Sequence, residues 1–129
     1  MRVVTVTWTV KAVEEWCEER GFDSYSEASK RFGRWIHGVS YESCFELMEE
    51  MEKYLESRAE LEGLLALKIF CGATETEIGY NERIYNLLKE ALMHVAEKSE
   101  KELIRSHAKA LIELIMTAEN LKSDIICSG

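Results

Sequence analysis

The chain of 129 residues carries a net charge of −8, is 47% hydrophobic and contains no proline. This length fits one domain, or a small domain with a helical extension. No apolar run approaches the roughly 20 residues of a membrane helix, and no signal-peptide pattern opens the chain, so we expect a soluble cytoplasmic protein. The four cysteines form no CxxC pair and the three histidines are scattered, which excludes the usual zinc-ligand spacings. We therefore expect ordinary thiols, with no metal and no cofactor.

Residues 2–9 are predicted to form a strand, and from Val4 to Thr9 they alternate strictly in the manner of a strand that is buried on one face. Apolar side chains fall on one side and threonines on the other, at Val4, Val6, Trp8 and at Thr5, Thr7, Thr9. A lone strand cannot satisfy its own backbone N–H and C=O groups. Because no later segment reads as a second strand, we expect this strand to pair with the same strand of a second copy.

Two amphipathic helices are predicted next, one over residues 10–20 and one from Ser24 or Ser26 to Ile36. Gly21 between them suits the left-handed residue that ends a helix. The second helix opens with four residues, Ser-Tyr-Ser-Glu, whose free backbone N–H groups and dipole could hold one phosphate. The plain alternative is a capped helix start without a ligand.

The strand, the first helix and the run from Gly21 to Ala28 together resemble the ribbon-helix-helix family of DNA-binding regulators, to which the Arc and methionine repressors belong. In that family two identical strands pair across a two-fold axis and enter the major groove as a ribbon. The resemblance implies a mainly α fold. A ribbon-helix-helix module would occupy residues 1–38, and an antiparallel three-helix extension for assembly or effector binding would occupy residues 39–129.

The function implied by this resemblance is that of a sequence-specific transcriptional repressor, a homodimer or higher homo-oligomer that binds double-stranded DNA. Base edges would be contacted by hydroxyl and methyl groups of the strand, at Val3, Thr5 and Thr7. The DNA phosphates would be held by the start of the second helix and by nearby cations, at Ser24, Ser26, Lys30, Arg31 and Lys11.

After a short boundary at residues 37–39 the chain is strongly helical. One helix is predicted from Ser40 or Ser43 to Phe70, with a buried stripe that includes Leu61 and Leu65. Gly63 inside this helix either weakens it or allows another helix to approach closely.

Two capping boxes, at residues 74–77 and 99–102, predict two further helices that end near Val95 and Leu121. The apolar tail, residues 125–127, is expected to dock on the helices or on a partner. Three helices with short links predict an antiparallel bundle.

The alternative to a regulator is a non-enzymatic structural or partner-binding protein whose ribbon serves only to dimerise. Residues 39–129 hold ten basic and eighteen acidic side chains, so this part carries the whole net charge and could bind a protein partner. An antitoxin-like module is a third possibility, disfavoured by the well-patterned C-terminal half. Without a nucleophile–base pair, a phosphate loop or a metal motif, we expect no enzyme.

Overall fold

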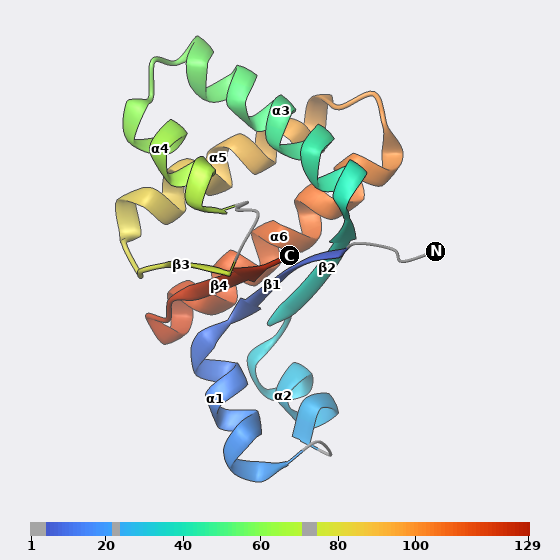
Figure 1. Ribbon diagram of the computed structural model, residues 1–129, viewed down its shortest axis with the longest axis vertical. Coiled ribbons are helices and arrows are strands. Elements are labelled where there is room, and N and C mark those ends of the chain that lie inside the picture. The colour runs from blue at the N-terminus through green and yellow to red at the C-terminus, as the bar shows by residue number, and fades with distance from the viewer. Residues whose placement is uncertain (1–4, 22–23, 71–74) are drawn as a thin grey trace.

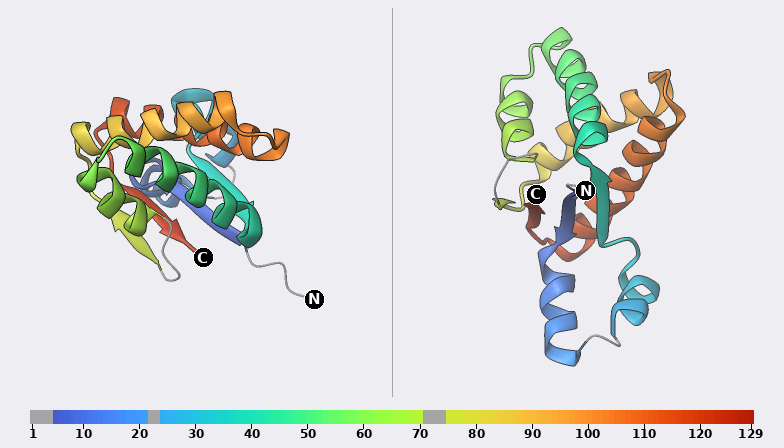
Figure 2. Two further views of the ribbon diagram at one scale, coloured as in Figure 1. Left: turned by 90° about the horizontal axis from the view of Figure 1, so that it is seen from above. Right: turned by 45° about the vertical axis from the view of Figure 1, so that its right-hand side comes forward.

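The protein is a mainly helical chain with one small antiparallel sheet. A computed structural model describes residues 5–21, 24–70 and 75–129 (Figure 1). The described elements are, in chain order, β1 (Thr5–Val10), α1 (Lys11–Arg20), α2 (Ser24–Phe32), β2 (Ile36–Ser40), α3 (Tyr41–Ser57), α4 (Leu61–Phe70), β3 (Thr76–Ile78), α5 (Glu82–Lys98), α6 (Glu102–Leu121) and β4 (Ile125–Ser128). Helices α3 to α6 gather on one side of the sheet, and α1 with α2 projects from it as a separate arm (Figure 2).

The sheet has the order β2-β1-β4-β3, so β1 is an interior strand. β1 pairs antiparallel with β2, where Thr5 lies opposite Ser40, and with β4, where Thr7 lies opposite Ser128. The expectation that β1 lacks a partner in its own chain, and pairs across a dimer, is therefore wrong. The error arose because β2 was assigned to the end of the second helix and to a boundary, and β4 to an apolar tail.

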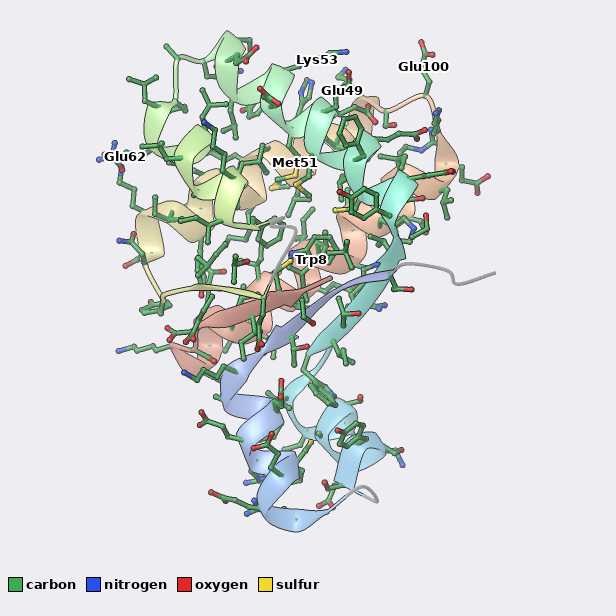
Figure 3. The ribbon with its side chains drawn as sticks, viewed as in Figure 1. Trp8, Glu49, Met51, Lys53, Glu62 and Glu100 are labelled. Atoms are coloured by element: carbon green, nitrogen blue, oxygen red, sulfur yellow. The ribbon has the colours of Figure 1, made fainter. Side chains whose placement is uncertain are left out.

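The alternating faces predicted for the first strand are found from Thr5 to Trp8, whereas Thr9 is buried, with 7% of its surface exposed, although it was expected on the open face. Val6 and Trp8 are buried, whereas Thr5 is exposed. The Trp8 indole N–H donates a hydrogen bond of 2.6 Å to the carbonyl oxygen of Phe70, and the two rings stack at 5.2 Å. Trp8 thus ties the sheet to the end of α4, in the interior between strands and helices (Figure 3).

The second helix is shorter than expected. It ends at Phe32, and Gly33 follows with φ at +92°, a left-handed conformation that glycine adopts without strain. Ile36, the predicted helix end, is the first residue of β2 instead. The predicted boundary at residues 37–39 lies within the same strand, so the sheet contains strands from both sides of it.

The single helix predicted up to Phe70 is interrupted. A turn at residues 58–60 separates α3 from α4, and Ala59 takes a left-handed φ of 53°. Gly63 then allows α4 to pack tightly on α3, because a Cβ atom at this position would lie 2.9 Å from a methyl carbon of Leu55. Of the two readings of Gly63, close helix approach is the one found.

The helix start predicted at the capping box of residues 74–77 is also wrong, since residues 76–78 form strand β3. Thr74 lies outside the described residues. Helix α5 begins later, where the side-chain oxygen of Asn81 accepts a hydrogen bond of 3.1 Å from the N–H of Ile84. The helix predicted from Ser99 exists as α6. Its first helical residue is Glu102, and the Ser99 hydroxyl donates to Glu50 at 3.0 Å.

The cysteines follow the expectation only in part. Cys17 and Cys127 are buried and not in disulfides, whereas Cys44 is disulfide-bonded. Among the described residues no group of three or more His, Cys, Asp or Glu side chains is arranged to hold a metal ion. In the same part of the chain, every helix is too short or too polar to cross a bilayer.

Candidate functional site

The residues expected to contact DNA bases lie on the open face of the sheet. Thr5 is exposed and Thr7 half-buried, on the side of β1 that faces away from the helices. Val3 lies outside the described residues. A ribbon that enters the major groove consists of two strands with free outer edges. Because β1 has a neighbour on each side, Thr5 and Thr7 belong to a four-stranded surface, not to a ribbon.

The residues expected to hold phosphates do not form one site. Ser24 is only 5% exposed, and its hydroxyl donates to the backbone carbonyls of Gly21 and Cys17. Lys11 forms an ion pair of 2.8 Å with Glu77 of β3. The remaining three, Ser26, Lys30 and Arg31, are exposed on α2, and the Arg31 guanidinium lies 5.8 Å from the centre of the Trp16 ring.

The strongest candidate for a functional surface lies on α3 and α4. Five of the eleven exposed large hydrophobic side chains in the described residues belong to these two helices: Tyr41, Phe45, Leu61, Leu65 and Ile69. Isolated apolar side chains are common on protein surfaces, whereas several on two neighbouring helices favour a binding site. We call these five residues the apolar surface.

The helical repeat places the members of the apolar surface in two rows. Tyr41 and Phe45 are four residues apart on α3, and Leu61, Leu65 and Ile69 recur every four residues on α4, so each set lies along one side of its helix. Phe45 is 67% exposed and Leu61 71% exposed. The opposite side of α3 is anchored in the core by residues such as Met51 (Figure 3).

A groove of about 480 Å³ lies between α3 and α4, beside the apolar surface. Its apolar lining comes from both helices and consists of Tyr41, Cys44, Phe45, Met48, Leu64 and Leu67. A second, shallower hollow of about 360 Å³ lies on the other flank of α4, and Leu65 and Ile69 contribute to it. The exposed row of α4 is therefore a ridge between two hollows.

The charged lining of the groove is mostly acidic. Glu52 and Glu56 of α3 and Lys68 of α4 line it. Other glutamates of the helical region have partners, for example Glu46 with Lys101 at 2.8 Å. Within the described part of the chain, no ion pair shorter than 4 Å involves Glu52 or Glu56. These two carboxylates are thus available to a cation from outside.

A separate polar feature joins β2 to α6. His37 Nε2 lies 2.9 Å from His107 Nδ1, and nearby Arg34 pairs with Glu113 of α6 at 2.8 Å. Burial of the ring lowers the pKa of His37 from 6.5 to about 4, with further lowering by the neighbouring His107 and Arg34. Burial also lowers the pKa of His107. The pair is a hydrogen bond between neutral rings that links β2 to α6.

Sequence reasoning missed the apolar surface for a definable reason. Leu61 and Leu65 were placed in a buried stripe because one continuous helix was assumed, and the turn at residues 58–60 removes them from that stripe. A signal was nevertheless present. Apart from Glu62 and Lys68, residues 61–70 carry no charge, and apolar side chains occur on every side of the helix. A helix at the edge of a small domain cannot bury all its sides.

Comparison with known proteins adds no family. No family model, no curated protein and no solved structure matches the chain. The ribbon-helix-helix resemblance therefore stays a prediction from the sequence.

Proposed function

We propose that this chain is a non-enzymatic partner-binding protein, and that it recognises another protein through the apolar surface on α3 and α4. The single observation that carries the proposal is the exposed aromatic ring of Phe45 at the mouth of an apolar groove. Aromatic side chains beside pockets are typical anchors of protein interfaces, and they contribute a large share of binding energy.

The extent of the apolar surface favours a protein partner over a small ligand. The groove has a volume in the range of small-molecule sites, but such ligands are mostly enclosed by the pocket that binds them. Here Leu61, Leu65 and Ile69 continue the apolar area beyond the groove and along the ridge of α4. A partner that covers both rows has to be larger than the groove.

Site-specific photo-cross-linking tests this function. We expect the protein carrying benzoylphenylalanine at position 45 to cross-link one discrete partner when it is expressed in its native cells. The same photoreactive residue at position 103, where Leu103 is also exposed but lies on α6, is the matched control. Leu65→Glu in the position-45 protein should abolish the cross-link, because it places a charge on the ridge.

Two outcomes would contradict the proposal. One is the absence of any cross-link at position 45. The other is an identical pattern of products from positions 45 and 103, which would indicate random collisions with abundant proteins.

DNA binding and self-association are still predictions from the sequence and are separate from this proposal. Their original rationale was a ribbon formed with a second copy, and that rationale is lost with the pairing of β1 inside its own chain. Fluorescence anisotropy on duplex DNA at low salt, comparing the native chain with Thr5→Ala/Thr7→Ala, measures DNA binding independently of the apolar surface.

A further inference from the structure

We propose that the partner docks an amphipathic helix with a basic flank into the groove between α3 and α4. This inference rests on the proposed function and specifies the chemistry of the partner. Its apolar side chains would lie on Phe45, Met48 and Leu64, and its Lys or Arg residues would meet Glu52 and Glu56.

The groove has the form that receives a helix. It runs between two helices joined by the short turn at residues 58–60, and its apolar lining comes from both of them. An incoming helix places apolar side chains every three or four residues along one side, which suits a groove of this kind. Leu65 and Ile69 on the ridge of α4 give the same helix a second row of contacts.

Charge complementarity selects a basic helix. Glu52 and Glu56 are exposed, line the groove and take part in no ion pair within the described residues. Among the described residues that line the groove, Lys68 is the only cation beside these two carboxylates, so the groove keeps an excess of negative charge. The net charge of −8 adds a long-range attraction for a basic partner and a repulsion for an acidic one.

Two labelled peptides of about 18 residues test this inference, since this length gives about five helical turns that can form in the groove. Both carry leucines at helical spacing, and the other positions are Lys in one and Glu in the other. Fluorescence anisotropy with the full chain should show micromolar binding of the Lys peptide and no binding of the Glu peptide. Phe45→Ala should weaken binding of the Lys peptide about tenfold, the effect of losing an interface anchor.

Two pairs of charge substitutions distinguish binding at the groove from general electrostatic attraction to the acidic chain. Glu52→Gln/Glu56→Gln should weaken binding several-fold and reduce its dependence on salt. Glu15→Gln/Glu18→Gln changes the net charge equally, but on exposed positions of α1, and should bind like the native chain. All substituted side chains are exposed, so the variants should fold, which circular dichroism checks.

Each contrary outcome has a distinct meaning. Equal binding of both peptides, or equal weakening by the two charge variants, would overturn the basic helix while a cross-link at position 45 still supported the proposed function. Failure of the Lys peptide to bind at all would also overturn it. Self-association of the native chain that Phe45→Ala abolishes would assign the groove to a second copy instead.

Discussion

Trp8→Ala should destabilise the protein by about 3–5 kcal/mol, the usual cost of deleting a large buried aromatic side chain. Trp8 is fully buried at the centre of β1, stacks on Phe70 and donates its indole N–H to the Phe70 carbonyl oxygen at 2.6 Å. The substitution leaves a cavity between sheet and helices and removes the link from β1 to the end of α4. Urea denaturation followed by circular dichroism measures the loss.

Trp8→Phe is the matched control for this prediction. It keeps an aromatic ring against Phe70 but removes the N–H donor, so it should cost less than Trp8→Ala, roughly 1–2 kcal/mol. Near-native stability of Trp8→Ala would contradict the structure, because a tryptophan in an exposed ribbon or a flexible strand would have no such cost.

The stability of the protein should fall on acidification from about pH 6.5 toward pH 4, owing to His37 and His107. Both have a pKa below the ordinary value of 6.5, about 4 for His37, so the unfolded chain takes up protons first as the pH falls. Stability is therefore full above pH 6.5 and decreases until the folded rings are protonated. Since both rings are partly exposed, we expect a loss of roughly 1–2 kcal/mol between pH 7 and pH 5.

Denaturation midpoints at several pH values, for matched variants, check this assignment. His37→Gln/His107→Asn replaces the ring nitrogens of the pair by amides that do not titrate, so its stability should be nearly flat between pH 7 and pH 5. His94→Gln changes the third histidine, which stacks on Tyr54 on α3, and should keep the native pH dependence. If His94→Gln removes the dependence, or the native chain shows none, the histidine pair is not responsible.

The elements that the sequence predicted correctly are those with a clear local pattern of apolar and polar residues. The alternation of Val6 and Trp8 with threonines is a property of a few neighbouring residues, and it correctly placed a strand there, with Val6 and Trp8 buried. The same is true of the helical character of residues 41–57 and 102–121, where apolar residues recur at helical spacing. Gly21 ends α1 with φ at 92°, as its position indicated.

What the sequence could not provide was the long-range pairing. Residues 36–40 contain a glycine and a histidine and resemble a linker, and they become a strand only because β1 offers them a hydrogen-bonding edge. Residues 125–128 are too short to show alternation, yet they join β1 from more than a hundred positions away. With β2 and β4 unrecognised, the sequence seemed to require a second copy.

The pairing of β1 also bears on the ribbon-helix-helix arrangement that the sequence resembles. A strand followed by two helices is present in the structure, as β1, α1 and α2. The family fold also requires the edge of that strand to be free, and in this chain both edges are occupied. The apolar surface of α3 and α4, distant from the arm, is then the part of the described molecule best suited to meet a partner.

Cysteine cross-linking at Thr5 tests most directly the claim on which this account depends, that β1 finds both of its neighbours inside its own chain. Thr5 and Ser40 lie directly opposite each other on β1 and β2, a separation that a disulfide can span. Oxidised Thr5→Cys/Ser40→Cys should give a monomer with an intrachain 5–40 link in peptide mapping, and Thr5→Cys alone should give no covalent dimer. A 5–5 linked dimer formed in high yield by the single variant would contradict the account and restore the intermolecular ribbon.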